Sequence, residues 1–153
     1  MKEYFSNLFR YNLWANTQVM KVLLKQQLIP EKSLLWMSHI IAAEIIWFSR
    51  ISEQDIESID LWTTVPVDEL KPLQEKFDAL YISYTDRKVD FDGEVSYKNT
   101  LGISHKSKIF DILIHVANHG TYHRGQIAAN LKANDIQPIS TDFIFWKRET
   151  LMN

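Results

Sequence analysis

The chain has 153 residues, of which 46% are hydrophobic and 24% charged, a composition that fits one soluble globular domain and excludes a disordered chain. Its 17 basic and 19 acidic residues give a formal net charge of -2, so no basic excess favours nucleic-acid binding. It has no cysteine and five histidines, which excludes disulfides, a cysteine nucleophile and thiolate metal sites, and leaves histidine, carboxylate or carbonyl oxygen as metal ligands.

The sequence shows no pattern that directs it to a membrane. Residues 1–5 are followed by charged and polar side chains rather than by the apolar core of a secretory signal. The most apolar stretch, 40–48, is interrupted by Glu44 and is shorter than the roughly 20 residues that cross a bilayer. We therefore expect a soluble cytoplasmic protein with no membrane partner, and we expect residues 1–153 to form one domain.

The first predicted helix spans 3–27, where apolar residues follow alternating three- and four-residue steps. The chain has only four glycines and four prolines, which favours such long helices over the many turns of an all-β fold. The same steps pass through Asn12 and Asn16, so two amides lie on the face meant for the core. Two interpretations stay open: a structural hydrogen bond, or a polar cavity beside this helix.

The second predicted helix spans about 32–51 and carries His39 on its apolar face. The polar segment 52–66 that follows predicts a long crossing loop with a short turn of helix. We expect Leu61 and Trp62 to anchor this loop by packing back on the bundle.

The second half of the chain continues the helical pattern. A third helix is predicted over 68–88 at coiled-coil spacing. Alternation and two glycines in 89–107 indicate a small β-hairpin or an extended loop. The fourth predicted helix runs over 107–133, with Ser107 as its cap.

A short last helix with Phe143 and Trp146 is expected after the capping residues 140–142. Together these elements predict an all-α fold: an up-and-down four-helix bundle with a small β-hairpin or extended loop before helix four and a short C-terminal helix. In that order the second and fourth helices run parallel. Bundles of this kind build their sites from inward-facing side chains on facing helices.

Three of the five histidines, His115, His119 and His123, lie four residues apart in the fourth predicted helix. Neighbouring members of this row lie about 6 Å apart on one side of the helix, so each adjacent pair could chelate one metal ion. The glutamate found between paired zinc ligands of metalloproteases is absent, which excludes that class. The alternative is that these histidines make hydrogen bonds along a helix edge.

Two further observations favour a metal site. His39 lies on the apolar face of its helix beside Ala42 and Ala43, which leave room for an imidazole ring. Gly120 and Gly125 flank the last histidine of the row inside a helix, where a glycine costs roughly 1 kcal/mol relative to alanine. They provide clearance for a ligand at a metal site, or they allow close helix packing alone; both interpretations stay open.

The sequence is similar to a known family over nearly its whole length. Four motifs closely resemble those of the DinB-like (YfiT-like) family, a group of proposed metal-dependent enzymes. The motifs are Tyr11–Asn16 (YNLWAN), His39 followed by Glu44 and Trp47, His115–Ile127 (HVANHGTYHRGQI), and Thr141 with Asp142.

The resemblance implies a four-helix bundle that holds a divalent metal ion with three histidines, which map onto His39, His119 and His123. It also implies a homodimer and activity as a transferase or isomerase with low-molecular-weight thiols. His115 is then an additional histidine beside the ligand set, and His105 in the predicted hairpin is expected to be exposed.

Three neutral imidazoles leave one coordination position open, as in catalytic rather than structural zinc sites. Histidine ligands suit zinc or nickel, with iron or manganese as further candidates. We expect a metal-dependent transferase or hydrolase with a small-molecule substrate, and any thiol at the site would come from that substrate because the chain has no cysteine. The alternative is a non-catalytic metal-binding or interaction module.

Several polar residues near these motifs have open roles. Glu44 and Asp142 are candidates, by family position, to accept the second N–H of a ligand histidine. Glu44 lies about 140° around the helix from His39, which favours another contact. Arg124 could meet an anionic substrate or form a solvated or interface salt bridge, and Gln126 has the same ambiguity.

Overall fold

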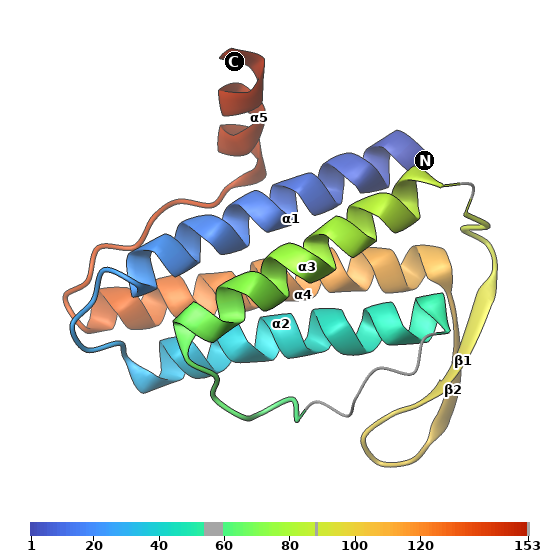
Figure 1. The fold of residues 1–153 in the computed structure, drawn as a ribbon, viewed down its shortest axis with the longest axis horizontal. Coiled ribbons are helices and arrows are strands. Elements are labelled where there is room, and N and C mark those ends of the chain that lie inside the picture. Colours follow the sequence, from blue (N-terminus) through green and yellow to red (C-terminus); the bar gives the residue numbers. More distant parts are fainter. Residues whose placement is uncertain (54–59, 88, 153) are drawn as a thin grey trace.

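Four long helices lie side by side in the molecule, with a β-hairpin at one end and a short fifth helix that projects away from them (Figure 1). The computed structural model describes residues 1–53, 60–87 and 89–152. The elements are α1 (Lys2–Leu23), α2 (Glu31–Ser52), α3 (Val67–Asp86), β1 (Glu94–Lys98), β2 (Ser104–Lys108), α4 (Ile109–Ala133) and α5 (Phe143–Met152). The predicted four-helix bundle with a hairpin and a short C-terminal helix is confirmed.

The directions of the helices differ from the simple up-and-down order. Ser33 near the start of α2 bonds Asn130 near the end of α4, whereas Trp47 near the end of α2 packs against His115 near the start of α4. α2 and α4 are therefore antiparallel, and Figure 1 shows that α2 and α3 run the same way. The reason is the long connection between α2 and α3, which returns the chain to the end of the bundle where α2 begins.

The core lies between the four long helices and is built from their amphipathic faces. Phe9 of α1 stacks on Tyr81 of α3 with ring centroids 4.4 Å apart, and both rings are fully buried. α2 is long and apolar enough to span a membrane by length and composition alone, but 61% of its most apolar 18-residue stretch is buried inside the bundle. The apolarity of α2 is therefore what its place in the core requires.

The ends of two helices differ from those that the sequence predicts. α1 ends at Leu23 rather than at residue 27, because the chain closes a turn there in which the Lys25 N–H bonds the Val22 carbonyl. Ser107 does not cap α4: it lies in β2, where its hydroxyl bonds the hydroxyl of Tyr97. The predicted end of the third helix at Lys88 lies outside the described residues, as do residues 54–59 of the loop in which a helical turn is expected.

The hairpin before α4 is confirmed as two antiparallel strands, with Tyr97 opposite His105. Gly102 in its turn has a φ of 77°, a left-handed conformation that glycine adopts without strain. His105 is exposed, as predicted. β1 packs against α2, so the hairpin forms a wall beside the helix that carries His39.

Candidate metal centre

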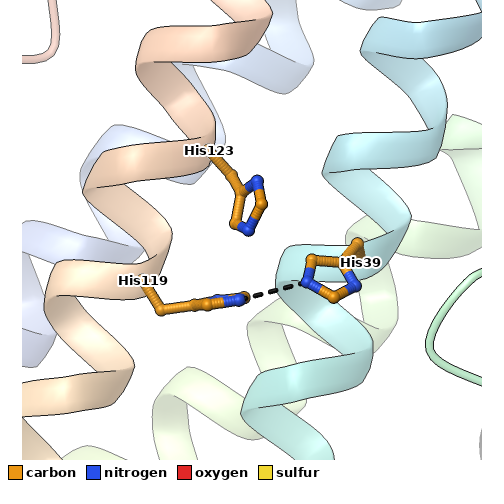
Figure 2. A group of neighbouring side chains, drawn as sticks. All are labelled: His39, His119 and His123. Atoms are coloured by element: carbon orange, nitrogen blue, oxygen red, sulfur yellow. Dashed lines mark hydrogen bonds between the residues drawn. The ribbon is translucent and has the colours of Figure 1, made fainter.

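Three histidines from two facing helices converge in the space between α2 and α4 (Figure 2). His39 comes from α2, and His119 and His123 come from successive turns of α4. One ring nitrogen of each lies within 4.8 Å of the other two. His39 and His123 are buried and His119 is half-buried. The structure thus brings together the three residues that the resemblance implies as metal ligands.

The closest pair of nitrogens has the spacing of two ligands on one ion. His39 Nε2 lies 3.1 Å from His119 Nε2. Because a carbonyl can only accept, His39 Nδ1 must be the protonated nitrogen that donates to the Leu61 carbonyl at 2.9 Å. The Nε2 lone pair of His39 therefore points at His119. Two imidazoles bound to a tetrahedral ion at 2.0–2.1 Å have nitrogens about 3.3 Å apart, so the donor set fits a metal ion.

His123 is oriented by a residue on its own helix. Its Nδ1 donates to Gln126 Oε1 at 2.6 Å, which leaves Nε2 as the nitrogen with a free lone pair. Gln126 therefore positions a histidine, as a partner of the second ring nitrogen usually does in metal sites. The three-residue spacing of this pair on one helix is the signal by which the contact could have been predicted.

The loop before α3 holds His39 from the other side. Besides the Leu61 carbonyl, the Trp62 indole stacks on the His39 ring with centroids 4.1 Å apart. The predicted anchoring of this loop by Leu61 and Trp62 is confirmed, and its contact point is His39 itself. Nothing in the periodicity of the sequence could show that a loop carbonyl fixes the tautomer of this histidine.

The cluster favours neutral imidazoles, which is the form that binds metal. Burial, and to a lesser extent the neighbouring histidines, lower the pKa of His119 from its usual 6.5 to about 3. Burial also lowers the pKa of His123, although the hydrogen bond that its Nδ1 donates to Gln126 acts in the opposite direction. Two of the three rings, those of His119 and His123, therefore resist protonation, and all three face one another, as ligands of one divalent cation would.

A cavity of about 620 Å³ opens beside His39 and His119. This volume falls within the range of small-molecule sites. The other lining side chains are mostly aromatic or polar and include Trp47, Arg50, Trp62, Tyr97, Asn99 and His105. His115 lies outside the three-histidine group, with its ring 5.5 Å from that of His119 and 5.3 Å from that of Trp47. The cluster is thus open to a ligand on the side that faces the hairpin.

Comparison with known proteins shows the family of this chain. The model of the DinB family matches residues 1–151. The chain belongs to the DinB family. The protein DinB of Bacillus subtilis (strain 168) is 27% identical over 161 aligned residues, which cover 94% of this chain and 93% of that protein. The resemblance that the motifs indicate is therefore confirmed, and the match includes both helices that carry the histidines.

A buried polar network lies behind the histidines of this DinB-family protein. Asn12 and Asn16 of α1 donate through Nδ2 to Glu44 Oε1 of α2, at 2.7 and 3.1 Å. Their Oδ1 atoms accept from Arg124 Nη1 of α4 at 2.8 and 2.7 Å. All four residues are almost fully buried. The two amides therefore serve structural hydrogen bonds, and they link three helices.

Neither Glu44 nor Asp142 has a hydrogen bond to His39, His119 or His123 in the described part of the chain. Glu44 bonds amides rather than a histidine, in line with its position on the helix. Asp142 accepts a hydrogen bond from the Ser140 hydroxyl and lines a separate cavity beside α1. Arg124 is 2% exposed and bonds the amides of Asn12 and Asn16, so the solvated salt bridge is wrong, while its contact with an anionic substrate stays a prediction.

Gly120 makes room for this network. A Cβ at Gly120 would lie 2.8 Å from Arg124 Nη1 and 2.9 Å from Asn12 Oδ1. A Cβ at Gly125 would meet nothing within 4 Å. Close helix packing therefore explains Gly120 but not Gly125, which lines the cavity beside α1.

We expect Glu44→Gln to change how the stability of this protein depends on pH. Burial raises the pKa of Glu44 to about 7 despite the hydrogen bonds from Asn12 and Asn16. The folded state thus holds this proton more tightly than the unfolded state, so the stabilisation present below pH 4.5 is lost as the pH rises through 7. Glutamine keeps an acceptor for both amides and cannot ionise.

Urea unfolding at pH 5 and pH 8 measures this effect. The free energy of unfolding of Glu44→Gln minus that of the wild type should grow by on the order of 2 kcal/mol between the two pH values. Asp78, whose pKa is also raised by burial and by Glu44, is present in both proteins. A difference that does not change with pH would contradict the raised pKa of Glu44.

Proposed function

We propose that this DinB-family protein binds one divalent metal ion through His39, His119 and His123, and that it is a metal-dependent transferase or hydrolase for a small molecule. The observation that carries the proposal is the approach of His39 Nε2 and His119 Nε2 to 3.1 Å, with His123 beside them. Imidazole ligands favour zinc or nickel, and iron and manganese are the next candidates.

The cavity beside the cluster supports an enzyme rather than a metal store. A divalent ion on three neutral imidazoles keeps a coordination position open and acidifies a water or thiol bound there. The chain itself positions the imidazoles through the Leu61 carbonyl and Gln126, and surrounds the open side with Trp47, Trp62 and Tyr97. Low-molecular-weight thiols are the substrate class that we propose to test first, since the chain supplies no thiol of its own.

Metal analysis of the purified protein tests the site. We expect about one equivalent of divalent metal per chain in the wild type and a loss of at least tenfold in affinity for His119→Ala, because one of three ligands is removed. His105→Ala is the matched control, since His105 is exposed on the hairpin and bonds Asn99. Equal metal content in wild type and His119→Ala would disprove the site.

The activity is tested separately with metal-loaded protein. Conjugation of glutathione, bacillithiol or mycothiol to electrophiles should be detectable in the wild type and absent in His119→Ala. Full metal content without turnover on any of these thiols or on hydrolysable esters would instead support a non-catalytic metal-binding module.

A further inference from the structure

Arg50 lies in the wall of the cavity that opens on the histidine cluster. Its guanidinium is held between two aromatic rings, 4.5 Å from the centroid of Trp47 and 4.6 Å from that of Tyr97. Its Nη2 donates to the Lys98 carbonyl at 3.0 Å. Arg50 at the end of α2 is thus fixed in place by its own helix and by β1.

This guanidinium has donors that the described residues do not use. A guanidinium carries five N–H donors, and one of them is satisfied by the Lys98 carbonyl. No carboxylate in the described part of the chain lies within ion-pair distance of Arg50. Burial lowers the pKa of this guanidinium. Asp60, the one acid among the described residues that line the cavity, is exposed and accepts hydrogen bonds from the Trp62 N–H and the Thr63 hydroxyl.

We propose that Arg50 binds a carboxylate, or another small oxyanion, on the substrate whose other end reaches His39, His119 and His123. This inference rests on the proposed function, because it takes the cavity to be the substrate site. It assigns the substrate to a narrower class: small molecules that carry a negative group at one end and a metal-binding group at the other.

The arrangement of Arg50 favours an oxyanion over other ligands. Aromatic rings lie near the guanidinium, which restricts the approach of a ligand to its remaining N–H edges. These edges match the two oxygens of a carboxylate, and such charge-assisted pairs are stronger than neutral hydrogen bonds. The same aromatic rings reduce the access of water, which strengthens the pair. A merely structural role is the alternative, in which Arg50 only fastens the hairpin to α2.

A charge series of thiols separates the two roles. Three probes of similar size are titrated calorimetrically into zinc-loaded full-length protein: 3-mercaptopropionate, 2-mercaptoethanol and cysteamine, with a negative, neutral and positive end. We expect the wild type to bind the anionic probe about tenfold more tightly than the neutral one, and the cationic probe most weakly. The bound zinc ion itself favours negative ligands, so a preference of the wild type for the anionic probe does not by itself show a role for Arg50. The comparison of the wild type with Arg50→Gln tests that role.

Arg50→Gln should reduce the preference for 3-mercaptopropionate over 2-mercaptoethanol about tenfold and leave the affinity for 2-mercaptoethanol nearly unchanged. Arg148→Gln on α5, away from the cavity, is the matched control and should keep the wild-type preference. Equal weakening of all three probes in Arg50→Gln, or an unchanged preference, would overturn the proposal in favour of the structural role.

The zinc content of each protein is measured in the same samples. Zinc bound at one equivalent without an Arg50-dependent preference refutes this inference alone. A wild type that binds no zinc refutes the proposed function, and the inference falls with it.

Discussion

Saturation with Zn²⁺ is expected to raise the free energy of unfolding by about 4 kcal/mol when the free ion is a thousandfold above its dissociation constant. The ion binds the folded state because only there do His39, His119 and His123 bring their nitrogens within 4.8 Å of one another. Urea unfolding followed by tryptophan fluorescence, with zinc and with a chelator, measures the difference. At the same zinc concentration His119→Ala should gain at least about 1.4 kcal/mol less than the wild type, because its affinity is at least tenfold lower.

Acid should also lower the free energy of unfolding of the metal-free protein. Since the folded pKa of His119 is lowered to about 3, the unfolded chain binds more protons below pH 6.5, so the stability from this group is complete above pH 6.5 and is lost as the pH falls toward 3. Zinc and protons then act against each other on the same nitrogens. A zinc-dependent stabilisation that is equal at pH 8 and at pH 3, where folded His119 is half-protonated, would contradict binding through these histidines.

Gly120→Ala is expected to lower the free energy of unfolding by about 2–3 kcal/mol. The new methyl group would lie 2.8 Å from Arg124 Nη1 and 2.9 Å from Asn12 Oδ1, and these two atoms are already hydrogen-bonded to each other inside the bundle. Neither can move aside without leaving a buried polar group unpaired. Thermal and urea unfolding of the metal-free proteins measure the loss.

Gly125→Ala is the matched control on the same helix. No atom lies within 4 Å of the added Cβ, so the higher helix propensity of alanine should raise the stability by up to about 1 kcal/mol. Equal effects of the two substitutions would show that the network around Arg124 tolerates displacement, and that Gly120 has no packing role.

Local periodicity was sufficient to predict the parts of the molecule that depend on one helix at a time. The apolar steps predict all four long helices, because each buries one face in a common core. His39 was predicted on a buried face for the same reason. The row of histidines on α4 follows from spacing alone, since residues four apart lie on one side of a helix.

Contacts between elements could not be predicted in this way. The direction of α3 depends on where the chain goes after α2, and no residue pattern in that loop specifies it. Arg124 looks like a surface residue in a polar motif, and only the arrival of Asn12 and Asn16 from α1 makes its burial favourable. The carbonyl of Leu61 has no side-chain signature at all.

The long sequence separation between interacting groups has a consequence for biosynthesis. His39 and His119 are 80 residues apart, and Asn12 and Arg124 are 112 apart. While a ribosome makes the chain from its N-terminus, the first three helices would bring Asn12 and Asn16 to Glu44 before the chain has the Arg124 guanidinium that donates to both amide oxygens. The nascent chain should therefore gain its stable fold, and with it the ability to take up a metal ion, only when α4 has emerged.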